Sequence, residues 1–254
     1  MSEPTAPAPT PQVKHDDIHS VVKSAGVIGV ATFSSRILGF VRDMVLARLF
    51  GATPAADAFF IAFRIPSLLR ELFAEGSMAS AFIPVFTEYR TTRSKQDAWE
   101  LASAVFTTLL TIVTFVTIVC MVAAPWLVQL LAPGFQENPD KLALTTLLAR
   151  IMFPYLLFVS LAALAMGILN SVRAFAAPAF SPLFLNVFII IGALLVSPLL
   201  REPIIGVAIG VVAGGAAQFA MQLPSLKLRG LLFGFRFEPG HPGLRRIGVL
   251  MVSK

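Results

Sequence analysis

The fold class is decided by residues 101–136, LASAVFTTLLTIVTFVTIVCMVAAPWLVQLLAPGFQ, which contain no charged side chain. A helix needs about 20 apolar residues to cross the hydrocarbon core of a bilayer, and this stretch is longer than that. Three more charge-free runs follow, at residues 151–172, 174–200 and 203–226. One such run could be a buried helix of a soluble enzyme. Four in series indicate an all-α membrane protein.

The overall composition supports this assignment. The chain has 254 residues, of which 56% are hydrophobic and 13% charged, whereas soluble domains carry about a quarter charged residues. If the N-terminus is cytoplasmic, the loops on the opposite side receive only Lys141 and Arg201. The loops on the cytoplasmic side carry Arg90, Arg93, Lys95, Arg173, Lys227, Arg229, Arg236, Arg245 and Arg246. The positive-inside bias therefore predicts a multi-pass inner-membrane protein with a cytoplasmic N-terminus. The net charge of +6 reflects this topology and does not indicate a nucleic-acid partner.

Six membrane-spanning helices are expected from the apolar runs and the turn residues between them. Their approximate bounds are 21–49, 55–89, 98–131, 142–170, 179–198 and 204–223, with a predicted break near Pro125. Residues 1–20 are expected to form a disordered cytoplasmic tail, because they are rich in proline and polar side chains. Residues 21–229 would form a six-helix lobe. Residues 230–254 would form a cytoplasmic loop and the start of a truncated seventh helix.

The first two spans carry an unusual number of charges. Nine lie at positions compatible with the membrane: Arg36, Arg42, Asp43, Arg48, Asp57, Arg64, Arg70, Glu71 and Glu75. A central Arg or Asp opposes insertion by about 2.5–3.5 kcal/mol, so these groups must face water or pair with one another.

At about 100° per residue, Ser35, Arg36, Gly39, Arg42 and Asp43 fall on one side of the first helix. Asp57, Arg64 and Glu71 form a stripe on the second, and Arg70 points elsewhere. Two stripes facing each other would line a charged cavity.

Three interpretations of this cavity are open. The charges could pair with one another and hold the helices together. The cavity could bind an anionic substrate, because the planar fork of arginine grips phosphate oxygens in a bidentate manner. The chain could also be an intramembrane enzyme, but it offers no convincing nucleophile or metal cage. Its three histidines lie in tail or loop segments, and Cys120 is the single cysteine. We therefore expect no catalytic residue, no metal and no cofactor.

Other polar residues of the apolar runs carry weaker signals. Asn170, Asn186 and Gln218 are expected to bridge helices through side-chain hydrogen bonds more often than to bind a ligand. Gly210, Gly214 and Gly215 are expected to let neighbouring helices approach closely.

Several segments resemble the MviN/MurJ family of lipid II flippases, in the multidrug/oligosaccharidyl-lipid/polysaccharide exporter superfamily. The resemblance rests on FSSRILGFVRDMVLARLFG (33–51), ADAFFIAFRIPSLLRELFAEGSMASAFIPVF (56–86), APWLVQLLAPGF (124–135) and FPYLLFVSLAALAMGILN (153–170). It covers about residues 21–229. It implies a protein that moves lipid II, an undecaprenyl-diphosphate-linked precursor, from the cytoplasmic to the periplasmic leaflet by alternating access.

The resemblance also implies a set of substrate-binding residues. By position these are Ser35, Arg36, Arg42, Asp57 and Arg70. The three arginines would meet the diphosphate and the sugar headgroup, and Asp57 would pair with an arginine and help to set the gating equilibrium. The family has about fourteen spans in two lobes, so the chain resembles an N-terminal lobe whose C-terminal partner lobe is missing. Two alternatives are a transporter of another polyprenyl-diphosphate-linked saccharide and a non-transport membrane scaffold for cell-wall synthesis.

Overall fold

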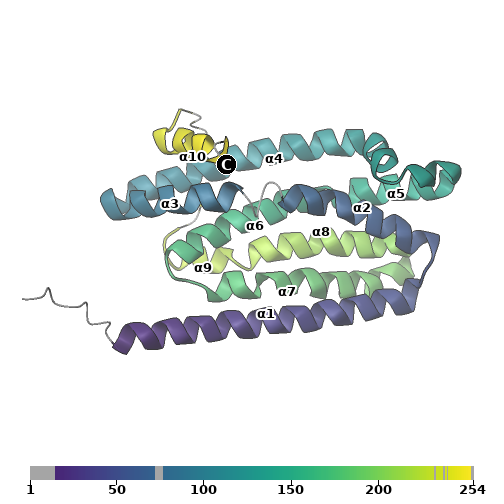
Figure 1. The fold of residues 1–254 in the computed structure, drawn as a ribbon, viewed down its shortest axis with the longest axis horizontal. Coiled ribbons are helices and arrows are strands. Elements are labelled where there is room, and N and C mark those ends of the chain that lie inside the picture. Colours follow the sequence, from purple (N-terminus) through teal and green to yellow (C-terminus); the bar gives the residue numbers. More distant parts are fainter. Residues whose placement is uncertain (1–14, 72–76, 232, 237, 239, 253–254) are drawn as a thin grey trace, which may run out of the picture.

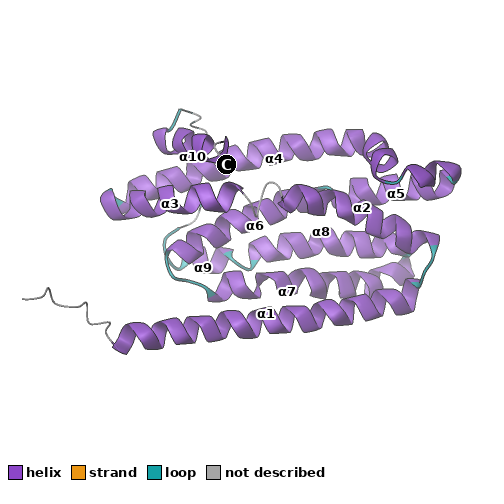
Figure 2. Cartoon of the chain, viewed as in Figure 1, coloured by secondary structure: helices purple, strands orange, loops and turns teal. Residues whose placement is uncertain are grey.

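A computed structural model describes residues 15–71, 77–231, 233–236, 238 and 240–252. Every regular element in these ranges is helical, so the all-α prediction is confirmed (Figure 2). The α-helices are α1 (His15–Phe50), α2 (Pro54–Arg70), α3 (Ser77–Thr92), α4 (Lys95–Leu131), α5 (Pro139–Met152), α6 (Pro154–Ser171), α7 (Ala176–Ile191), α8 (Ile204–Ala220), α9 (Leu223–Lys227) and α10 (Pro242–Val252). Short helical turns cover Pro133–Glu137, Gly192–Val196 and Ser197–Leu199.

Five helical stretches of the described chain are long and apolar enough to cross a membrane. They are Ala25–Phe50, Lys95–Leu131, Pro139–Ser171, Ala176–Leu199 and Ile204–Lys227. The predicted count of six is therefore not confirmed. The missing one is the predicted span 55–89, which is divided into α2, of 17 residues, and α3, of 16 residues. The two helices follow each other along the bundle (Figure 1), and residues 72–76 between them, with Glu75, lie outside the described residues.

Two expected boundaries differ from the structure. The first helix begins at His15 and not near residue 21. Residues 1–14 of the predicted tail lie outside the described residues. The predicted break near Pro125 is wrong, since α4 continues through this proline to Leu131.

The helices α7 and α8 pack closely through glycine. A Cβ atom added to Gly210 would lie 2.5 Å from the carbonyl oxygen of Phe188, and one added to Gly214 would lie 2.9 Å from the Cα atom of Leu185. No side chain fits into these gaps, which confirms the packing role expected for the glycines. On its other side α7 packs against α1, so α7 separates α1 from the centre of the bundle (Figure 1).

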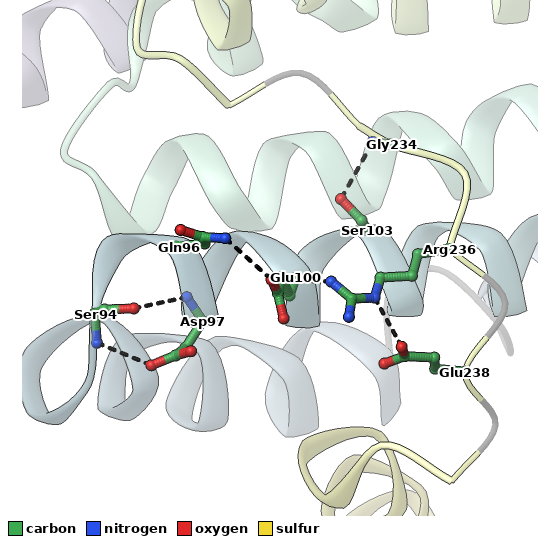
Figure 3. Close-up of polar contacts among 8 residues, drawn as sticks. All are labelled: Ser94, Gln96, Asp97, Glu100, Ser103, Gly234, Arg236 and Glu238. Atoms are coloured by element: carbon green, nitrogen blue, oxygen red, sulfur yellow. Dashed lines mark hydrogen bonds and ion pairs between the residues drawn. The ribbon is translucent and has the colours of Figure 1, made fainter.

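The start of α4 is fixed by its own side chains. Ser94 Oγ accepts a hydrogen bond of 3.0 Å from the backbone N–H of Asp97, and Asp97 Oδ2 accepts one of 3.2 Å from the N–H of Ser94 (Figure 3). This reciprocal cap satisfies two backbone donors at the helix terminus.

The segment after α9 is tied along α4. Gly234 N donates to Ser103 Oγ at 3.2 Å, and Arg236 pairs with Glu100 and Glu238, each at 2.9 Å (Figure 3). The predicted start of a seventh helix, from Leu244 on, lies within α10. That helix packs mainly against α3, and Arg246 forms an ion pair of 2.8 Å with Glu88.

Candidate functional site

The helix α1 is the most exposed of the candidate spans. Only 6% of the apolar segment of α1 is buried inside the protein, compared with 67% of the apolar segment of Pro139–Ser171. It packs on α7 along one side (Figure 1), and Phe33, Ile37 and Phe40 are exposed elsewhere on its surface. The span that carries Arg36, Arg42 and Asp43 is therefore covered on one side only.

Arg42 lies at the centre of a polar cluster between α1 and α7. Its Nε and Nη2 atoms donate hydrogen bonds of 3.0 and 2.8 Å to Asp43 Oδ1, and its Nη1 atom donates one of 2.8 Å to Asn186 Oδ1. Asn186 Nδ2 in turn donates to the carbonyl oxygen of Ser35 at 3.3 Å. Asn186 is 7% exposed, whereas the Asp43 side chain is 60% exposed. A buried neutral amide thus orients the guanidinium from one side, and an exposed carboxylate neutralises it from the other.

This pair borders a largely apolar cavity. Arg42 and Asp43 lie at the edge of a space of about 490 Å³, and the residues that α2 contributes to its lining include Phe59, Phe60 and Phe63. Phe59 and Phe63 are stacked with ring centroids 5.9 Å apart. A cation–anion pair beside an aromatic wall suits a molecule that has both a charged group and an apolar part.

Asp57 lies elsewhere. Its carboxylate forms an ion pair of 2.7 Å with Lys141 Nζ, and the ammonium also lies 4.0 Å from the centroid of the Phe135 ring. The Lys141 side chain is only 16% exposed. The expectation that Asp57 pairs with an arginine is therefore wrong for this structure. The reason is that α2 packs chiefly against α5, which carries Lys141.

The remaining predicted arginines occupy two other places. Arg36 is exposed on α1. Arg70, at the end of α2, borders a separate cavity of about 100 Å³ together with Ser181, Gln218 and Gln222. The polar stripes of the first two spans do not face each other, because α1 packs on α7 and α2 on α5. The structure thus links Ser35 and Arg42 through Asn186. It pairs Asp57 with Lys141 and places Arg70 beside another cavity.

Sequence reasoning captured some polar partners and missed others. Asn186 was expected to bridge helices, and its bonds to α1 confirm this. Lys141 was assigned to a loop, and its pairing with Asp57 was missed. Arg150 was also overlooked, although it is a charge inside an expected span, and its Nε atom donates to the carbonyl oxygen of Met121 at 3.1 Å. Among the described residues, no three His, Cys, Asp or Glu side chains are placed to hold a metal ion.

Comparison with known proteins gives consistent matches. The family model described as "Lipid II flippase MurJ" matches residues 46–253. The lipid II flippase MurJ of Burkholderia cenocepacia is 38% identical over 225 residues, which cover 87% of this chain and 44% of that protein. The probable lipid II flippase MurJ of Vibrio cholerae is 41% identical over 241 residues, which cover 91% of this chain and 46% of that protein.

A solved structure agrees with these matches. It is a lipid II flippase MurJ in an inward closed conformation, with a TM-score of 0.72 and 29% identity, covering 89% of this chain and 47% of that one. The chain therefore spans less than half the length of these relatives.

Proposed function

The chain belongs to the family of MurJ lipid II flippases, and we propose that it forms the N-terminal lobe of a transporter that moves lipid II between membrane leaflets. The observation that carries this proposal is the uncovered face of α1. A helix that crosses a membrane with Arg36 and Asp43 exposed near its middle is unfavourable in contact with lipid alone. A second lobe across from α1 would enclose these charges in an aqueous cavity.

The substrate contacts follow from the chemistry of the arginines. Arg36 and Arg42 lie nearly two turns apart on α1, and their guanidinium groups suit the oxygens of a diphosphate. Arg42 is already oriented by Asn186 at 2.8 Å, so it meets an anion with little loss of side-chain freedom. Arg70 would reach the same headgroup from α2 once the second lobe closes the cavity. Binding and release need no covalent step, which is why we assign no enzymatic activity.

The mechanism is alternating access between two lobes. Each lobe would move largely as a body around the cavity at the middle of the membrane. The Asp57–Lys141 pair joins α2 to α5 at 2.7 Å, away from the Arg42 cluster. It would form in one access state and break in the other, and would so help to set the balance between the two states.

The membrane arrangement is a bacterial inner membrane with a cytoplasmic N-terminus. In this arrangement α2 and α3 act in series as one crossing, which brings the number of crossings to six. This assignment agrees with the cations at one end of the bundle, where Arg90 lies in the last turn of α3, Arg93 follows α3 and Lys95 begins α4.

The decisive experiment tests growth and transport together. The chain is expressed with the second lobe that its relatives carry, in a strain depleted of its own flippase. We expect growth to be restored, and we expect Arg36→Ala to abolish it while Arg48→Ala, at the end of α1, has little effect. A protein that only organises the cell-wall machinery would restore growth with either variant. The substrate is identified by comparing two flipping rates in proteoliposomes, that of fluorescent lipid II and that of another polyprenyl-diphosphate-linked saccharide. We expect lipid II to be flipped faster.

A further inference from the structure

A basic hollow lies at the end of the bundle where α3 ends and α4 begins. Its volume is about 410 Å³, and its lining combines the cations Arg90, Lys95 and Arg229 with apolar residues that include Phe86 and Val172. A neighbouring hollow of about 240 Å³ shares Arg229 and adds Arg173. Neither lining contains a carboxylate. Four cations from different segments therefore gather around two adjoining spaces.

Two of these cations are oriented by the backbone. Arg90 Nη1 donates a hydrogen bond of 3.0 Å to the carbonyl oxygen of Ser171, and Arg229 Nη1 donates one of 2.9 Å to that of Ser225. Each bond uses one nitrogen of the guanidinium fork and fixes the direction of the group. Arg173 has a backbone φ of 57°, the left-handed conformation that commonly ends a helix, and the N–H of Ala174 donates a hydrogen bond of 2.8 Å to the carbonyl oxygen of Leu169 there.

The acidic residues near the hollow are engaged elsewhere. Glu88 pairs with Arg246 at 2.8 Å, and Glu100 pairs with Arg236 at 2.9 Å. Asp97 caps the start of α4. Within the described ranges, no ion pair is found for the four cations of the two hollows. No carboxylate of the described residues neutralises these four cations, and an anion in the hollow would do so.

The position of the hollow indicates the source of this anion. Four of the five candidate spans begin or end around it: two begin at Lys95 and Ala176, and two end at Ser171 and Lys227. Figure 1 shows these helix ends gathered at one end of the bundle. Residues at the ends of membrane-spanning helices lie at the level of the lipid headgroups. The cations thus lie at the level of the lipid headgroups, beside the apolar lining residues Phe86, Ala98, Val172 and Leu231.

We propose that this hollow is a binding site for the phosphate group of an anionic phospholipid. The guanidinium groups of Arg90 and Arg229 would hold the phosphate oxygens through charge-assisted hydrogen bonds, with Lys95 and Arg173 beside them. The apolar residues of the lining would contact the part of an acyl chain nearest the headgroup. The site is independent of lipid II transport, because it lies at the end of the bundle and uses none of the five residues proposed to contact that substrate.

The test uses the chain joined to the second lobe that its relatives carry, in a neutral detergent, and counts bound lipids by native mass spectrometry. The probes are a short-chain phosphatidylglycerol and the matching phosphatidylcholine. We expect the wild-type chain to prefer phosphatidylglycerol, and the double variant Arg90→Gln/Arg229→Gln to bind it about tenfold more weakly or worse, since two charged contacts near the membrane surface are lost. A second double variant, Lys95→Gln/Arg173→Gln, removes charge without touching the two carbonyl bonds and should weaken binding as well.

The matched control is Lys227→Gln/Arg245→Gln. It removes the same charge near the same end of the bundle from exposed residues outside both linings, and should change the affinity by less than about twofold, because solvent and salt screen exposed charges that do not contact the lipid. Equal losses in the control and the hollow variants would mean diffuse attraction and would overturn the proposal. Equal binding of the two lipids by the wild-type chain would do the same. Displacement of the lipid by millimolar inorganic phosphate would assign the hollow to a soluble phosphate compound instead.

Discussion

Arg42 of α1 donates a hydrogen bond of 2.8 Å to Asn186 of α7, and the same amide donates to the carbonyl oxygen of Ser35 at 3.3 Å. Ser35 and Arg42 are about two helical turns apart. One buried side chain therefore fixes α1 at two points along its length and sets the direction of the guanidinium group. Any movement of α1 relative to α7 must break or stretch these bonds.

We expect Asn186→Leu to destabilise the chain by about 1.5–3 kcal/mol, the usual value of a hydrogen bond to a charged group. Leucine has a similar size, so the loss reflects the two hydrogen bonds and not a cavity. The measurement is equilibrium unfolding in detergent. Asn170→Leu is the control, because the described structure shows no hydrogen bond from the Asn170 side chain. Equal losses for both variants would contradict the role assigned to Asn186.

The shape of the Arg42 side chain, and not only its charge, is expected to matter. Three of its nitrogens are engaged, two with Asp43 and one with Asn186, and an ammonium group cannot reproduce this planar arrangement. Arg42→Lys in the two-lobe protein should therefore fail to support growth of a flippase-depleted strain, at wild-type expression level. Arg48→Lys, at the exposed end of α1, should support it. If lysine replaced Arg42 without loss, charge alone would account for the site.

A charge swap tests the link between α2 and α5. Asp57→Lys and Lys141→Asp should each lower the free energy of unfolding by about 1 kcal/mol or more, because each places like charges beside each other. The double variant should recover part of this loss. The control is the ion pair between Glu88 and Arg246, whose side chains are 46% and 55% exposed. Exchanging the charges of this pair should have almost no effect on the free energy of unfolding. Additive losses at Asp57 and Lys141 would rule out a direct interaction.

The positions of the helices were predicted from the sequence better than the pairs of helices that pack against each other. Charge-free runs reveal length and apolarity, and these fix the spans directly. Packing partners depend on shapes that a single sequence does not display. The polar stripes of the first two spans were expected to face each other, but the close glycine contacts at Gly210 and Gly214 draw α8 against α7, and α1 then packs on the other side of α7.

The sequence indicated which kinds of residue form the site better than it indicated which residues contact each other there. Arg42 stood out because a charge in an apolar run is costly, and for the same reason Arg150 could have been found. Asn186 could be assigned as a helix bridge, but not to α1, because hydrogen-bond partners separated by 144 residues leave no local pattern. Lys141 was placed in a loop because the expected span began at residue 142, although α5 begins at Pro139 and carries Lys141 to Asp57.

The topology makes a prediction that separates five crossings from six. Reporters fused after Arg93 and Arg229 should be cytoplasmic, because these residues follow the ends of α3 and α9. Reporters fused after Thr53 and Asn138 should be periplasmic, because these residues precede α2 and α5. Figure 1 shows the ends of α3 and α9 at one end of the bundle and the starts of α2 and α5 toward the other. Fusions to alkaline phosphatase and to green fluorescent protein report the two sides. A cytoplasmic signal after Thr53 together with one after Arg93 would mean that α2 and α3 do not form a crossing.

The chain by itself is expected neither to flip lipid II nor to sustain growth. Alternating access needs two bodies that move against each other, and the exposed face of α1 has no second body in this chain. Each central charge left in contact with lipid costs about 3 kcal/mol, so the chain expressed alone should be degraded or should associate through α1. Co-expression of the second lobe as a separate chain should restore part of the activity, because preformed helices can meet without a covalent link. Flipping in liposomes that hold the 254-residue chain alone would refute this and would point to a homodimer.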